Sequence, residues 1–130
     1  MKYQESKEDY LENILVLSQE IDPKTNKMRH VHAINIVHKT NYSKPSVSIA
    51  MRKLVESNDI IINEKGEIYL TEQGRETASS IYDRHVTLRK GLISLGVSEE
   101  VALEDACKIE HYLSKESYQA IKKHLNKEHF

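Results

Sequence analysis

Residues 43–71, SKPSVSIAMRKLVESNDIIINEKGEIYLT, contain the pattern that decides the fold. Ser43 is a favourable helix N-cap, and Pro45 lies in the first turn, where a missing backbone N–H costs least. Apolar residues then recur at three- and four-residue spacing. We therefore predict a helix over about residues 44–57, with one apolar face directed inward.

A β-hairpin is predicted directly after this helix. Residues 60–63 and 67–71 are rich in Ile, Tyr and Thr, and Lys65-Gly66 supplies the turn between them. A helix followed by a hairpin is typical of a DNA-binding helix with a β-wing beside it.

Two further helices are predicted before this stretch. Ser6 and Asp9 form a capping-box-like pair, and apolar spacing then predicts a helix over about residues 7–20. Residues 21–27 are predicted as a loop, with a short strand at 28–30, and a short helix fits residues 31–39. The resulting order predicts a winged helix-turn-helix.

The remainder of the chain is predicted to be helical, over about residues 72–95, 99–113 and 115–126. The fold class is therefore mainly α, with an N-terminal winged helix-turn-helix, a small β-hairpin wing and a C-terminal helical dimerisation domain. We set the domains at residues 1–73 and 74–130.

Charge is unevenly distributed although the net charge of the 130 residues is only −1. Residues 27–53 contain six cationic side chains and no carboxylate, so the rest of the chain has a net charge of −7. A cationic segment in an anionic body favours binding of a polyanion such as double-stranded DNA. The candidate DNA contacts on the third helix and the wing tip are Ser43, Lys44, Pro45, Ser46, Ser48, Arg52, Lys53 and Lys65. For the serines, ordinary helix capping is the alternative.

The sequence gives no sign of a membrane or of an oxidising compartment. No apolar run reaches the roughly 18 residues that a membrane-spanning helix needs, and the N-terminus lacks the apolar segment of a secretion signal. A single cysteine, Cys107, cannot form an internal disulfide. We expect a cytoplasmic protein.

Metal-capable side chains recur at helical spacing. Thiolate, imidazole and carboxylate together suit a divalent first-row transition ion better than calcium. Taken singly, each residue is more often a core or surface residue than a ligand, so spacing alone leaves both readings open. The candidates are Asp9 with Glu12, then Cys107 with Glu110 and His111, and finally His85.

Four motifs carry a resemblance to a known family, and they occur in the order ESKEDYLENILVL, TEQGRETA, IYDRH and DACKIEHYLS. In this order the chain resembles the metal-dependent repressors of the diphtheria toxin repressor and manganese transport regulator type, in a short form without an SH3-like domain. The resemblance implies a homodimer that binds DNA through its N-terminal lobes. It also implies Mn²⁺ or Fe²⁺ bound between the lobes, with Zn²⁺ or another divalent ion possible in vitro.

The ligand set combines features of two branches of that family. Asp9 and Glu12 match the acidic ligands of the manganese-type members, whereas Cys107 matches the cysteine of the iron-type members. The iron-type ancillary site is not expected, because Arg89 and Leu103 stand where its carboxylate and histidine would be.

These features predict a metal-dependent repressor of metal-uptake genes that binds a palindromic operator and is not an enzyme. One alternative is a winged-helix regulator that responds to an organic ligand, with a structural or vestigial metal site. A metallohydrolase is disfavoured because no HExxH segment or Gly-rich loop is present. Oxidation of Cys107 as a signal stays open, although the chain has no second cysteine to resolve it.

Overall fold

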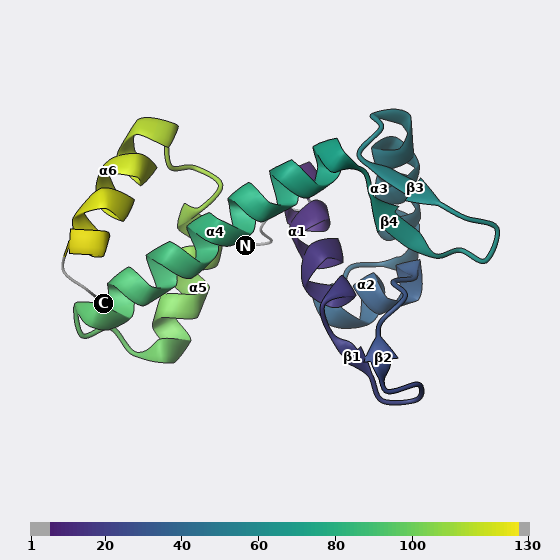
Figure 1. The fold of residues 1–130 in the computed structure, drawn as a ribbon, viewed down its shortest axis with the longest axis horizontal. Coiled ribbons are helices and arrows are strands. Elements are labelled where there is room, and N and C mark those ends of the chain that lie inside the picture. The colour runs from purple at the N-terminus through teal and green to yellow at the C-terminus, as the bar shows by residue number, and fades with distance from the viewer. Residues whose placement is uncertain (1–5, 128–130) are drawn as a thin grey trace. The chain divides into compact units, whose positions relative to one another are not determined.

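A computed structural model describes residues 6–127 of the chain (Figure 1). The outermost residues of both predicted domains, 1–5 and 128–130, lie outside this described part. The chain divides into two compact units, Met1–Ser79 and Ser80–Phe130, which we describe separately. The observed division lies six residues after the predicted boundary at 73/74, and that boundary stays a prediction.

The first unit is a winged helix-turn-helix, as predicted (Figure 1). Helix α2 ends at Asn41, which has a left-handed backbone (φ 63°), and a turn over residues 41–43 leads into α3. The antiparallel pair β3 and β4 forms the wing that follows α3. The elements are α1 (Lys7–Ser18), β1 (Ile21–Asp22), β2 (Lys27–Met28), α2 (Ala33–Thr40), α3 (Lys44–Glu56), β3 (Ile60–Ile62), β4 (Ile68–Leu70) and the start of α4 (Glu72–Ser94).

The predicted loop at residues 21–27 is wrong in one respect, because it contains most of a small hairpin. Ile21 pairs with Met28 and Asp22 with Lys27. The Asp22 carboxylate accepts the Lys24 N–H, and Asn26 adopts a positive φ of 59°. Asp and Asn tolerate such turns through their own side-chain hydrogen bonds, and this turn closes a ladder too short to show as a strand pattern.

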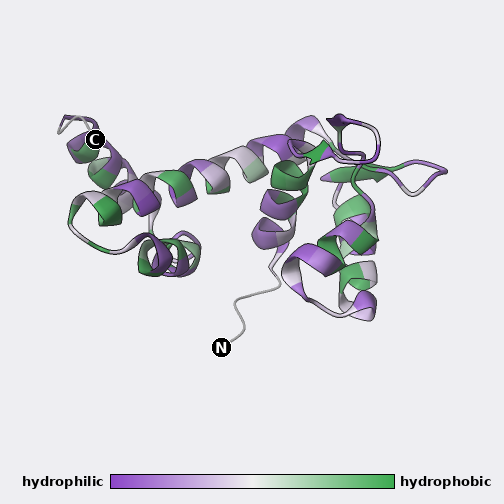
Figure 2. Ribbon diagram, turned by 90° about the horizontal axis from the view of Figure 1, so that it is seen from below, coloured by the Kyte–Doolittle hydropathy of each residue, from purple (hydrophilic) through white to green (hydrophobic). Residues whose placement is uncertain are grey.

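The core of the first unit comes from buried apolar residues of α1, α2 and α3, of the wing and of the start of α4. Figure 2 shows that hydrophobic and hydrophilic residues alternate along these helices. Each large side chain buried in this way contributes about 1.5–3 kcal/mol. This core fixes α3 against α1 and α2 and leaves the opposite face of α3 exposed. The main contributors are Leu11, Ile14, Leu15, Ile36, Val47, Met51, Leu54, Ile60 and Ile68.

A buried carboxylate, Asp59, connects three parts of this unit. Its side chain, 1% exposed, accepts hydrogen bonds from Lys7 of α1 (2.8 Å), Ser57 at the end of α3 (2.5 Å) and Gln73 of α4 (2.8 Å). Burial alone would raise its pKa, but these three donors hold the pKa below the ordinary value of 3.8. Gly74 packs so tightly here that a Cβ would lie 2.0 Å from the Asp59 carbonyl oxygen.

The second unit contains the rest of α4 with α5 (Glu99–Ile109) and α6 (Lys115–Lys127). Ser98 caps α5 by accepting the Val101 N–H. Helix α6 is held to α4 by Tyr118, which donates its hydroxyl proton to Asp83, and by Lys122, whose ammonium group lies 2.8 Å from the same carboxylate.

Among residues 6–127, no helix combines the length and apolar character required to cross a membrane.

We predict that Asp59→Asn lowers the free energy of unfolding by about 1–3 kcal/mol at pH 7. Because folding depresses the pKa of Asp59, its stabilisation is fully present above pH 3.8 and is lost as the pH falls through the lower folded value. The deficit of the variant should therefore shrink below pH 3.8. Urea denaturation followed by circular dichroism measures it. Glu56→Gln, an exposed carboxylate of α3, is the control, and a deficit independent of pH would contradict the prediction.

Candidate metal centre and nucleic-acid interface

The second unit brings four of the six predicted ligands together. The imidazole Nδ1 of His85 lies 3.1 Å from Glu110 Oε2 and 3.6 Å from the sulfur of Cys107. On the other side of the carboxylate, His111 Nε2 lies 3.4 Å from Glu110 Oε1. Both imidazoles thus lie next to the Glu110 carboxylate, and the Cys107 sulfur lies next to His85.

Glu110 is the centre of this cluster. It is only 2% exposed, and a buried carboxylate is costly unless a cation or strong hydrogen-bond donors compensate it. Donors bound about 2.1 Å from one tetrahedral ion lie about 3.4 Å apart, close to the observed donor separations. The cluster therefore fits a divalent transition ion in the chemistry of its donors and in the separations of these three neighbouring pairs.

The backbone around Glu110 corrects one prediction. Helix α5 ends at Ile109 instead of about Leu113, so Glu110 is its C-cap and His111 lies in the following turn. The N–H groups of Tyr112 and Leu113 both donate to the Ile109 carbonyl oxygen, which ends the regular α-helical pattern. This turn carries both Glu110 and His111.

Arg84 holds that turn, a role that was not predicted from the sequence. Its guanidinium donates to the carbonyl oxygens of Glu110 (3.3 Å) and Leu113 (2.6 Å), and it also lies 5.1 Å from the Tyr118 ring centre. Capping by a cation satisfies carbonyl groups that a helix end leaves without partners. No sequence signal identifies Arg84, because its hydrogen-bond acceptors are main-chain atoms far along the chain.

The other two predicted ligands, Asp9 and Glu12, lie one turn apart on α1 in the first unit. Both are half-buried. Asp9 accepts a hydrogen bond of 2.6 Å from the Tyr42 hydroxyl. These acids belong to the helix that packs beneath the helix-turn-helix, whereas the four-residue cluster belongs to the second unit.

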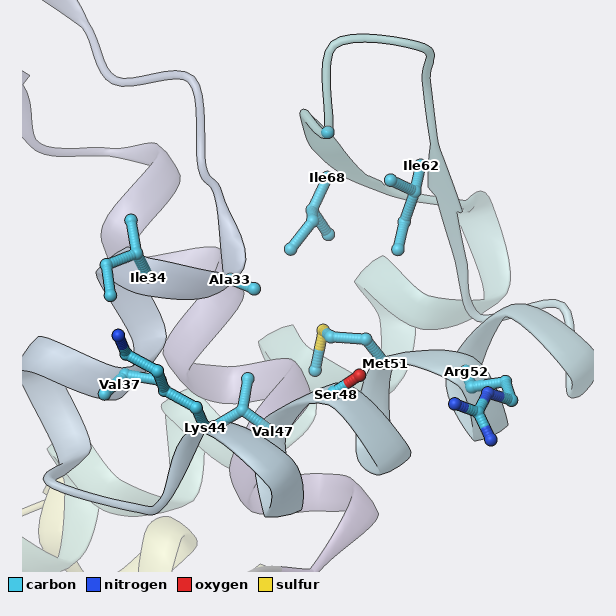
Figure 3. A pocket seen from close by; sticks show the side chains of 11 residues that line it. Ala33, Ile34, Val37, Lys44, Val47, Ser48, Met51, Arg52, Ile62 and Ile68 are labelled. Carbon is cyan, nitrogen blue, oxygen red and sulfur yellow. The ribbon is translucent and has the colours of Figure 1, made fainter.

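The predicted DNA contacts all lie on the first unit. Ser43 accepts the Ser46 N–H, so its capping role is confirmed. Lys44, Ser48 and Arg52 line a groove of about 550 Å³ between α2, α3 and the wing (Figure 3). Pro45 and Lys53 are exposed on α3, and Lys65 lies in the turn that joins the wing strands. This face offers cations and hydroxyl groups around an apolar floor.

Comparison with known proteins identifies the class first: the chain is a winged-helix transcriptional regulator. It is 32% identical over 124 residues to an uncharacterized HTH-type transcriptional regulator of Methanocaldococcus jannaschii. The matched region covers 95% of this chain and 94% of that protein. It is also 27% identical over 115 residues to the transcriptional regulator MntR of Escherichia coli, over 88% of this chain and 70% of that protein.

The family follows from the second unit. Residues 71–129 match the iron dependent repressor family, metal binding and dimerisation domain. The chain therefore belongs to the metal-dependent repressor family of the diphtheria toxin repressor and manganese transport regulator type, which confirms the resemblance seen in the sequence.

Solved structures agree with this assignment. The manganese regulator SloR is 29% identical with a TM-score of 0.76, covering 93% of this chain and 54% of that chain. A manganese-dependent transcriptional repressor in complex with manganese is 25% identical with a TM-score of 0.80, covering 93% and 53%. The chain thus spans about half the length of these structures, and the mainly helical fold class is confirmed.

We predict that a bound ion shields the exposed Cys107 thiol. Saturating Zn²⁺ should slow its reaction with Ellman's reagent severalfold, because a coordinated thiolate is no longer a free nucleophile. Glu110→Gln should remove most of this protection, whereas Glu104→Gln, an exposed acid on the same helix, should retain it. An unchanged rate in protein shown by calorimetry to have bound Zn²⁺ would contradict the prediction.

Proposed function

We propose that this protein is a metal-dependent DNA-binding transcriptional regulator, a cytoplasmic repressor of metal-uptake genes that responds to Mn²⁺ or Fe²⁺. The observation that carries the proposal is the buried Glu110 carboxylate between His85 and His111, with the Cys107 sulfur beside His85. This cluster occurs in a chain whose other unit is a winged helix-turn-helix. The curated relatives are transcriptional regulators, and we propose a regulatory rather than a catalytic role.

The proposed ligands are Asp9 and Glu12 of α1 together with His85, Cys107, Glu110 and His111. When bound, the ion would supply positive charge that attracts donors of both units. The residues would contribute neutral imidazoles and a deprotonated thiol, so binding releases protons and strengthens as the pH rises. In this way the ion would favour one arrangement of the DNA-binding unit relative to the dimerisation unit.

This preference sets the strength of the response. To move an equilibrium from 1:99 to 99:1, an ion must favour the DNA-binding state by about 5.5 kcal/mol. An ion that both states bind equally well would leave the equilibrium between them unchanged. Ligands taken from two units provide such a difference, because the complete set exists in only one arrangement.

On the DNA, α3 would enter the major groove, and Arg52, Lys53 and Lys65 would contact phosphates. Such contacts give affinity without sequence information. Two copies related by a two-fold axis would present two α3 helices to half-sites one or more helical turns apart, about 34 Å per turn. A palindromic operator follows from this symmetry.

Homodimerisation is supported by the apolar surface of the second unit. A groove of about 950 Å³ lies between α4, α6 and the end of α5, and Leu95, which lines it, is 80% exposed. A second copy of the same unit would bury this surface. Its apolar lining includes Leu88, Leu92, Ile109, Ile121 and Leu125.

The proposal predicts that DNA binding requires the ion. Metal-free protein should bind a fluorescent duplex, selected from a random pool with Mn²⁺ present, at least tenfold more weakly than protein with Mn²⁺ or Fe²⁺ under anaerobic conditions. Glu110→Gln should lose most of this gain, and Glu104→Gln should keep it. Binding that is indifferent to EDTA and Mn²⁺ would instead support a regulator that responds to an organic ligand.

The hybrid ligand set gives a further prediction. Cys107→Glu replaces a soft sulfur with a hard oxygen, so it should strengthen the response to Mn²⁺ relative to Zn²⁺. Cys107→Ser, which removes the sulfur without adding a carboxylate, is the control. Half-saturation concentrations from the same DNA titration measure the ranking. If the ranking of the two ions is the same in the Glu variant as in the natural protein, Cys107 is not a ligand that selects between them.

A further inference from the structure

We propose that Tyr42 is a positioning residue that transmits metal binding at Asp9 to the first turn of the DNA-reading helix α3. The inference rests on the proposed metal site, and it concerns contacts that lie entirely within the first unit. The Tyr42 side chain touches the candidate ligand Asp9, and Tyr42 directly precedes Ser43, the N-cap of α3.

The side chain of Tyr42 is held at both its hydroxyl and its ring. The hydroxyl donates to Asp9 Oδ2 at 2.6 Å, between residues 33 positions apart in the sequence. The ring meets the edge of the Tyr10 ring, with centroids 5.5 Å apart and planes at 62°. Tyr10 is buried in the core at 2% exposure. If Asp9 moves, the Tyr42 hydroxyl can keep its hydrogen bond only when the Tyr42 ring moves against the Tyr10 ring.

The main chain of Tyr42 is equally constrained. Its N–H donates to Thr40 Oγ1 (3.2 Å), and that hydroxyl donates to the Ile36 carbonyl oxygen of α2 (2.7 Å). The next residue, Ser43, caps α3 by accepting the Ser46 N–H. A shift of Tyr42 therefore reaches Ser43 and Ser46, two of the proposed DNA contacts.

The chemistry of the carboxylate allows this double role. A carboxylate offers about four lone-pair positions, so Asp9 can bind an ion while it continues to accept the Tyr42 hydroxyl proton. Hydrogen bonds to ligating carboxylates orient them, and losing one typically costs 10–100-fold in metal affinity. An ion that orders Asp9 therefore also orders Tyr42. By linkage, DNA bound by α3 raises the affinity for the metal by the same factor by which the metal raises the affinity for DNA.

The test uses Tyr42→Phe in the full chain, because this variant keeps the ring and removes only the hydroxyl. Cd²⁺ is the probe, since it is diamagnetic and leaves amide signals visible in ¹H–¹⁵N correlation spectra. In the natural protein, Cd²⁺ should shift the amide signals of α1 around Asp9 and those of Ser43 and Ser46. In Tyr42→Phe at saturating Cd²⁺, the shifts of the α1 amides should persist. The shifts of the Ser43 and Ser46 amides should fall below half of their size in the natural protein. Cd²⁺ affinity by calorimetry should fall about tenfold.

Tyr69→Phe is the matched control, because it removes another hydroxyl that donates to a carboxylate, Glu67 of the wing, which is not a candidate ligand. It should leave Cd²⁺ affinity and the Ser43 and Ser46 shifts unchanged. Equal shifts in Tyr42→Phe and natural protein, or no shift at Ser43 and Ser46 in the natural protein while α1 responds, would overturn the inference. No heat and no shift anywhere would instead defeat the proposed metal site itself.

Discussion

The burial of the Glu110 carboxylate is the constraint on which the second unit depends. A charged group with 2% exposure must be compensated by neighbouring positive charge or by strong donors. His85 and His111 lie on either side of it, and Arg84 fixes the turn that carries it. The unit is thus folded around a group that attracts a cation, and the same feature makes the cluster a candidate metal centre.

Helix α1 carries the two proposed metal ligands of the first unit. One face of α1 supplies core residues, and another carries Asp9 and Glu12. Because α1 packs against α2 and α3, a force applied to its acids acts on the DNA-reading part of the molecule. In the proposed function, metal binding at these acids and DNA recognition are joined through the core packing of α1, with the Tyr42 hydroxyl as an additional and more direct contact.

The parts of the fold with strong local signals were predictable from the sequence. Ser43 and Pro45 determined the start of α3, and the turn at Gly66 determined the wing. The end of α5 was placed four residues too late because no Gly or Pro marks it, and competition among main-chain hydrogen bonds at Ile109 decides it. The hairpin at Ile21–Met28 was missed because its strands are two residues long; the short strand predicted at residues 28–30 overlaps the observed β2 only at Met28.

The candidate site was predictable only in its residue types. Helical spacing indicated that Cys107, Glu110 and His111 belong together. His85 was a candidate to join them, the family resemblance strengthened that prediction, and the structure places His85 beside Cys107 and Glu110. The contacts of Arg84 and Tyr42 were not predictable, since each joins residues more than 25 positions apart and depends on packing in three dimensions.

The most direct measurement is a crystal structure of the protein grown with Mn²⁺, with anomalous diffraction used to locate the ion. The account predicts an anomalous peak coordinated at once by Glu110 with its neighbouring imidazoles and by a carboxylate of α1. A peak bound by residues of the second unit alone, with Asp9 and Glu12 remote from it, would contradict the account.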